Sequence, residues 1–125
     1  MPTIEITKEN IHSTIENNDI VILDFWASWC GPCVQFGPIF ESASQKHTDI
    51  VFGKINTEEQ QALGAEFNVR SIPMITIFRE QIMLYHNPGS LPPERLDEIL
   101  TQVKALDMDD VRKQIAEQEK KDPQN

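Results

Sequence analysis

The chain has 125 residues, of which 39% are hydrophobic and 25% charged, a balance typical of one globular domain with room for a core. Its formal net charge of −9 disfavours binding to nucleic-acid phosphates. It has no apolar run long enough to span a membrane and no N-terminal signal-peptide pattern, so a cytoplasmic location and no membrane partner are expected.

The first half of the chain predicts alternating strands and helices. Residues 3–6 alternate apolar and polar side chains like a short edge strand, and residues 8–16 have the spacing of a short amphipathic helix. Residues 20–26, Ile-Val-Ile-Leu-Asp-Phe-Trp, are typical of a strand buried on both faces of a parallel sheet. A crossover helix is predicted from residue 33 to about residue 47, with Pro38 expected to kink it.

The second half predicts a helix, a hairpin and a further helix. Residues 50–55 form the next expected strand, and Thr57 is the expected N-cap of the helix that follows. Two short strands, 74–78 and 82–85, are close enough to form an antiparallel hairpin. A helix is expected over 92–104. The expected fold class is therefore α/β, with a central mixed sheet of four or five strands flanked by helices.

A C-terminal extension follows this pattern. We expect a domain over residues 1–106 and an extension over 107–125, made of a short helix with a frayed tail. The helix has one narrow apolar stripe, formed by Met108, Val111 and Ile115. Because a helix this short is marginal in water, we expect the stripe to pack on the domain beside the 92–104 helix, away from Cys30.

The chemistry is predicted to reside in Cys30 and Cys33. They are separated by two residues, Gly31 and Pro32, and lie between a buried strand and a helix, so they can close a small disulfide. A helix N-terminus presents unpaired N–H groups and the positive end of the helix dipole, which favour a thiolate on the first cysteine. Such a thiolate attacks a substrate disulfide, and the second cysteine resolves the mixed disulfide.

Two other uses of this cysteine pair are possible. A structural zinc site requires about four ligands, but the chain has only two cysteines and three scattered histidines, His12, His47 and His86. The pair could also be two inert buried thiols. The position at a strand–helix junction favours the redox function over both alternatives, so no metal site is expected.

Residues 24–33, Asp-Phe-Trp-Ala-Ser-Trp-Cys-Gly-Pro-Cys, resemble the active-site signature of the thioredoxin family. The resemblance covers about residues 3–105 in the same element order. It includes Pro38, Lys54, Ile72-Pro73 and Gly89. It implies a thioredoxin fold and a thioredoxin-like protein-disulfide reductase that binds no cofactor and works through a redox-active Cys30–Cys33 disulfide.

The resemblance also implies a role for each matching residue. Cys30 would be the exposed attacking thiolate and Cys33 the buried resolving thiol. Asp24 would be a buried carboxylate that helps to deprotonate Cys33, with Lys54 as its pairing partner. An aspartate in an apolar strand also needs an explanation of its own, because a buried unpaired charge is costly and its pKa rises. The substrate-binding groove would be formed by Trp29, Gly31, Pro32, Ile72, Gly89 and Pro73, the last after a cis peptide bond.

The expected partners follow from the same resemblance. They are protein disulfides as substrates and an NADPH-dependent thioredoxin reductase as electron source, with the chain itself a monomer. Val34 and Met74 replace residues that are usual in the family, and the expected hairpin lacks the common glycine, which leaves partner identity open. A reductant dedicated to one enzyme, or a chaperone-like binding module without catalysis, is the alternative.

Overall fold

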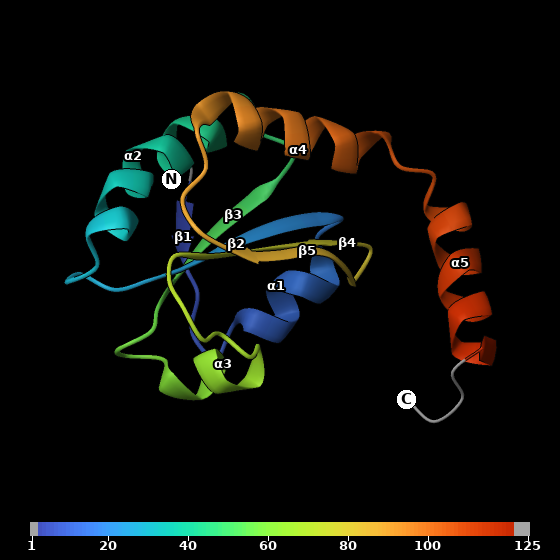
Figure 1. Cartoon of the computed structure of the whole chain (residues 1–125), viewed down its shortest axis with the longest axis horizontal. Helices are drawn as coiled ribbons and strands as arrows, with labels where there is room; N and C mark the ends of the chain where they lie inside the picture. The colour runs from blue at the N-terminus through green and yellow to red at the C-terminus, as the bar shows by residue number, and fades with distance from the viewer. Residues whose placement is uncertain (1–2, 122–125) are drawn as a thin grey trace.

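Strand β2 (Ile20–Trp26) lies at the centre of a five-stranded sheet of order β1-β3-β2-β4-β5 (Figure 1). All of its residues except Trp26 are buried, as predicted for a strand covered on both faces. The computed structural model describes residues 3–121. The other elements, in chain order, are β1 (Thr3–Glu5), α1 (Ile11–Asn17), α2 (Gly31–Lys46), β3 (Val51–Asn56), α3 (Gln61–Glu66), β4 (Met74–Arg79), β5 (Ile82–Pro88), α4 (Pro93–Ala105) and α5 (Met108–Lys121).

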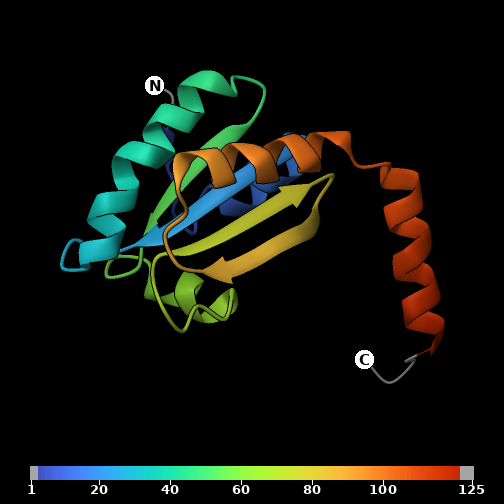
Figure 2. The same cartoon turned by 45° about the horizontal axis from the view of Figure 1, so that its top comes forward.

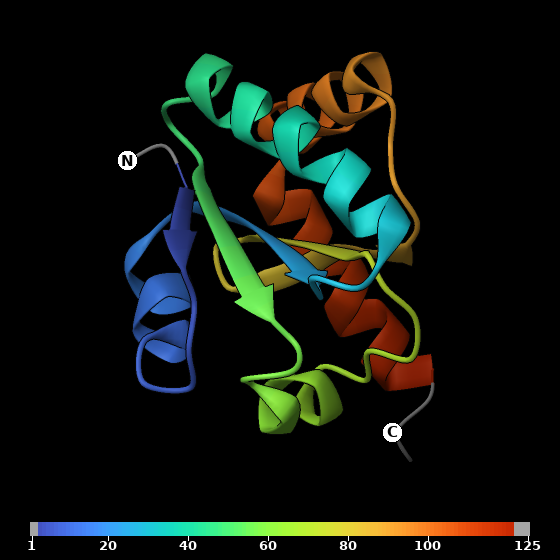
Figure 3. The ribbon, with the colours of Figure 1, turned by 90° about the vertical axis from the view of Figure 1, so that its left-hand side faces the viewer.

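The sheet is mixed, as the sequence predicts. Strands β1, β3 and β2 are parallel, whereas β4 is antiparallel to both β2 and β5. Helices α2 and α4 cover one face, and α1 and α3 cover the other (Figures 1 and 3). Alternation along β2 divides its side chains between the two cores: Ile22 packs with Phe36 and Leu96 on the α2 side. Val21, Leu23 and Phe25 pack with Leu63 on the α3 side.

Helix boundaries differ from the predictions at two places. Helix α1 begins at Ile11, after a turn that the periodicity did not separate from it. The expected N-cap at Thr57 is wrong, because a turn comes first and α3 begins at Gln61. The Thr57 hydroxyl instead donates to the carbonyl oxygen of Trp26 at 3.0 Å, which joins this turn to the end of β2. Helix α2 continues through Pro38, and the expected kink stays a prediction.

Helix α5 stands away from the rest of the molecule (Figure 2). Met108 is buried, but Ile115 remains 40% exposed, so the expected packing of the whole stripe beside α4 is wrong. The reason lies at the junction of the two helices. Arg79 Nη1 donates to the carbonyls of Val103 and Leu106 and ends α4, and the Asp107 carboxylate then caps α5 in a new direction.

Helices that cross a membrane are long and apolar. None of the helices formed by residues 3–121 has both the length and the hydropathy needed to cross a membrane.

Candidate active site

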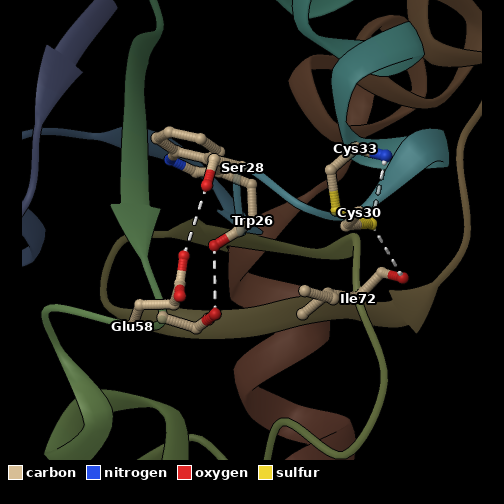
Figure 4. Close-up of a disulfide and its surroundings, with 7 residues drawn as sticks. Trp26, Ser28, Cys30, Cys33, Glu58 and Ile72 are labelled. Carbon is tan, nitrogen blue, oxygen red and sulfur yellow. Dashed lines mark hydrogen bonds between the residues drawn. A yellow bond between two sulfur atoms is a disulfide. The ribbon is translucent and has the colours of Figure 1, made fainter.

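The two cysteines lie where β2 leads into α2. Cys30 is the N-cap residue of α2, and its disulfide to Cys33 closes across a Cα–Cα distance of 5.2 Å. The Cys33 backbone N–H donates to Cys30 Sγ at 3.2 Å (Figure 4). The same N–H, with the helix dipole behind it, would stabilise negative charge on Cys30 after reduction. The local geometry therefore favours a thiolate at the first cysteine.

Access to the disulfide is from one side. Cys30 and Cys33 are 5% and 3% exposed, whereas the neighbouring Trp29 is 70% exposed. The prediction of an exposed Cys30 is therefore wrong for this disulfide form, because Trp26, Ala27 and Ile72 pack around the sulfur atoms. Cys30 nevertheless lines a surface groove, and Cys33 does not. A substrate in the groove would meet Cys30 first.

The groove beside Cys30 has a volume of about 730 Å³. Four of the residues expected in the substrate-binding groove line it: Trp29, Gly31, Pro32 and Ile72. The other walls were missed by the sequence analysis, and they come from Thr57, from Gln61, Gly64 and Ala65 of α3, and from Val69, Arg70 and Ser71. The last three directly precede Ile72-Pro73 in the sequence, and this adjacency could have predicted that they line the groove.

Pro73 and Gly89, both expected in the substrate-binding groove, are not among the residues that line it. The Ile72–Pro73 peptide bond is cis, as the resemblance implies. The Gly89 N–H donates to the Pro73 carbonyl at 2.7 Å, and Gly89 has a φ of 107°, a conformation that favours glycine. Cys30 Sγ lies 3.7 Å from the Ile72 carbonyl oxygen (Figure 4). Pro73 and Gly89 thus position the Ile72 backbone next to the reactive sulfur.

Asp24 is fully buried in the middle of β2. Neither of its carboxylate oxygens has a hydrogen-bond partner among the described residues. Burial raises the pKa of Asp24 to about 7, and the charge of Lys54 opposes this rise only in part. Strand alternation places Asp24 on the same side as Ile22, beneath α2. The site therefore contains a carboxyl group that can gain or lose a proton near neutral pH.

Lys54 is opposite Asp24 in the β2–β3 register. Asp24 and Lys54 form no ion pair within 4.0 Å among the described contacts, so the predicted pairing has no direct contact behind it in this structure. The Lys54 ammonium instead lies 5.0 Å from the centre of the Trp26 ring, a cation–π contact. It acts on Asp24 through its charge across the strands.

None of the three histidines lines the groove beside Cys30. His12 lies near Glu66, His47 contacts Asp97 and Lys104, and His86 contacts Thr76. Within residues 3–121, no three metal-ligating side chains converge on one point.

A disulfide at a helix N-terminus, open on one side to a groove and built on this sheet, defines a thiol–disulfide oxidoreductase. The comparisons with known proteins agree. The family model described as Thioredoxin matches residues 2–102, and the chain belongs to the thioredoxin family.

Relatives and solved structures support the same assignment. A Streptomyces coelicolor protein that carries the name thioredoxin 2 is 49% identical over 117 residues, 94% of this chain and 87% of its own length. Thioredoxin C-3 of Corynebacterium nephridii is 37% identical over 79% of this chain and 69% of its own. The structure is similar to a thioredoxin mutant of Halobacterium salinarum, with a TM-score of 0.76, 26% identity and coverage of 85% and 95% of the two chains. The chain is thus a protein-disulfide oxidoreductase whose redox centre is Cys30–Cys33.

Proposed function

We propose that the chain is a protein-disulfide reductase in which Cys30 attacks and Cys33 resolves. The observation that carries this assignment is that Cys30, and not Cys33, lines the groove. The Cys30 thiolate attacks one sulfur of the substrate disulfide, forms a mixed disulfide and releases the other substrate sulfur as a thiolate. Cys33 then attacks Cys30 Sγ, releases the second substrate thiolate and closes the disulfide seen here. Two electrons pass from the dithiol to the substrate.

Asp24 is proposed as the proton acceptor for Cys33. A resolving thiol must lose its proton before it can attack, and an acceptor works best when its pKa lies near the working pH. Asp24 meets this condition, with a pKa of about 7, and it lies beneath α2, the helix that carries Cys33. Lys54 is proposed to keep this pKa from rising further, as a positioning charge and not as a direct partner.

The substrate is proposed to lie in the groove as an extended segment. The Ile72 backbone, next to Cys30 Sγ, offers it main-chain hydrogen bonds. Trp29, Gly31 and Pro32 line the same groove, while the hydrogen bond from Gly89 N–H to the Pro73 carbonyl supports the backbone that follows Ile72.

The electron source is proposed to be an NADPH-dependent thioredoxin reductase, with the chain acting as a monomer in the cytoplasm and binding no cofactor of its own. Family membership supports this proposal. The Gly31-Pro32 pair between the two cysteines also favours a reductant over an oxidase or isomerase. The binding-module alternative is not favoured, because both cysteines and Asp24 are in place.

The test is insulin reduction followed by turbidity, with dithiothreitol or with NADPH and a thioredoxin reductase. We expect the wild type to accelerate precipitation, and Asp24→Asn to be several-fold slower at pH 7 because Cys33 then lacks its acceptor. Failure of the wild type to accelerate reduction would contradict the reductase assignment. An unchanged rate for Asp24→Asn from pH 6 to 8 would contradict only the role of Asp24.

A further inference from the structure

Arg70 gives the groove a local charge that differs from that of the whole molecule. Of the described residues that line the groove, Arg70 is the only ionisable one besides Cys30. The chain as a whole has a net charge of −9. The α3 side of the groove thus presents one positive group within an acidic protein, a few residues before Ile72.

Arg70 also differs from the other arginines in its pairing. The chain has four arginines, and three of them have a carboxylate within ion-pair distance: Arg79 with Asp19, Arg95 with Glu98, and Arg112 with Glu80 and Asp109. Arg70 has no such partner among residues 3–121. The chain contains 20 acidic residues, yet none of those described neutralises this guanidinium.

The end of α3 holds Arg70 in place. Val69 N–H donates to the Gly64 carbonyl at 2.8 Å and Asn68 N–H to the Ala65 carbonyl at 3.1 Å, while Asn68 has a φ of 55°. These are the two hydrogen bonds and the left-handed residue of a Schellman motif. The Asn68 side-chain oxygen then accepts a hydrogen bond from Arg70 Nε at 3.1 Å. The guanidinium is oriented through one nitrogen, and its two terminal amino groups remain for a ligand.

We propose that the α3 side of the groove is a subsite for an acidic residue of the substrate polypeptide, with Arg70 as the residue that determines this specificity. The inference rests on the proposed function, because a substrate disulfide at Cys30 must bring its flanking residues into this groove. A carboxylate fits the paired donors of a guanidinium. The acidic surface repels such a substrate at long range, but salt screens this effect beyond about 8 Å, so the local contact decides the preference.

The experiment uses short peptides with one cysteine linked to 2-thiopyridine, an uncharged leaving group. The Cys30 thiolate of the reduced protein attacks the peptide sulfur and releases thiopyridone, which is followed by absorbance. Each peptide carries Glu, Gln or Lys at one position, and the varied position is one of the three residues on either side of the cysteine. Second-order rate constants are compared for the wild type, Arg70→Gln, Arg70→Glu and Arg95→Gln, the last as a control arginine on α4.

At one or more positions, we expect the Glu-to-Gln rate ratio of the wild type to exceed that of Arg70→Gln by about two- to fivefold, the range of an exposed charge pair, at an ionic strength of about 0.15 M. Arg95→Gln should keep the wild-type ratio, and Arg70→Glu should favour the Lys peptide. Equal ratios for the wild type and Arg70→Gln at every position would overturn the subsite. The Gln peptide measures thiol–disulfide exchange at Cys30 without the charge contact. Its failure to react with the wild type would therefore contradict the proposed function.

Discussion

At the scale of single residues, Asp24 lowers the stability of the folded state and is at the same time suited to proton transfer. It is fully buried and has no hydrogen-bond partner among the described residues, so ionisation costs the folded state free energy. An apolar residue would fill the same position in β2 without that cost. The proposed proton transfer near neutral pH, which the raised pKa of Asp24 permits, would account for a carboxyl group at this position.

The first prediction concerns Asp24→Asn and stability. Since the pKa of Asp24 rises from 3.8 to about 7 on folding, the wild type loses stability as the pH increases through this range, and the loss is complete above about pH 7. Urea unfolding of the disulfide form should show Asp24→Asn more stable by up to about 4 kcal/mol at pH 8, with the difference approaching zero at pH 4. A pH-independent difference for Asp24→Asn would refute the assignment.

The second prediction concerns the order of thiol reactivity. In the disulfide form, Cys30 Sγ accepts a hydrogen bond from the Cys33 N–H and Cys30 borders the groove, whereas Cys33, in the first turn of α2, is buried and does not line the groove. Iodoacetamide at neutral pH should therefore alkylate Cys30 well before Cys33, as measured by mass spectrometry of peptides at short times. Faster modification of Cys33 would reverse the two roles.

At the scale of elements, long periodic segments were predictable and the segments between them were not. The β2 pattern and the crossover helix α2 follow from apolar runs that only a buried strand and an amphipathic helix satisfy. The start of α3 depended on whether residues 57–60 form a turn, which is decided by a tertiary hydrogen bond from Thr57 to Trp26. The α3 wall of the groove was missed for the same reason, since its position depends on how α3 packs on the sheet.

The third prediction tests the packing of β3 on the α3 side of the sheet. A Cβ at Gly53 would lie 2.5 Å from Ile6 Cγ1 and 3.2 Å from Leu23 Cδ2, both on buried side chains. Gly53→Ala should therefore lower the free energy of unfolding by about 1–3 kcal/mol. In Gly64→Ala, the control, the added carbon meets no atom within 4 Å outside the adjacent backbone of α3, and alanine favours the helix by up to about 1 kcal/mol. Equal effects of the two substitutions in urea unfolding would contradict this packing.

At the scale of the whole molecule, helix α5 is joined to the sheet and its covering helices at one corner. Met108 is buried at the junction, and Arg112 of α5 contacts Glu80 in the β4–β5 hairpin. The groove that contains Cys30 lies between α2 and α3, whereas α5 follows α4 beyond the other end of the sheet (Figure 2). The sequence predicted the helix from its apolar stripe, but not its direction, which follows from the end of α4 at the Arg79 contacts and the Asp107 cap of α5.

The fourth prediction concerns removal of residues 107–125, which tests the proposed division of the chain at residue 106. Because Met108 is the one buried residue of α5, the truncated chain should lose about 2 kcal/mol of stability and keep insulin reduction within about twofold. Met108→Ala in the full chain should account for most of the loss. A large fall in activity without unfolding would place α5 in substrate or reductase binding.

The central claim is that electrons reach a substrate disulfide through Cys30 first and Cys33 second. The most direct measurement is mass spectrometry of the adducts formed when reduced Cys33→Ser and Cys30→Ser variants meet a protein disulfide. A stable mixed disulfide should accumulate through Cys30 in Cys33→Ser, because the resolving thiol is absent. The Cys30→Ser variant should form little adduct, because its remaining thiol does not border the groove. Accumulation in Cys30→Ser, with none in Cys33→Ser, would contradict the mechanism.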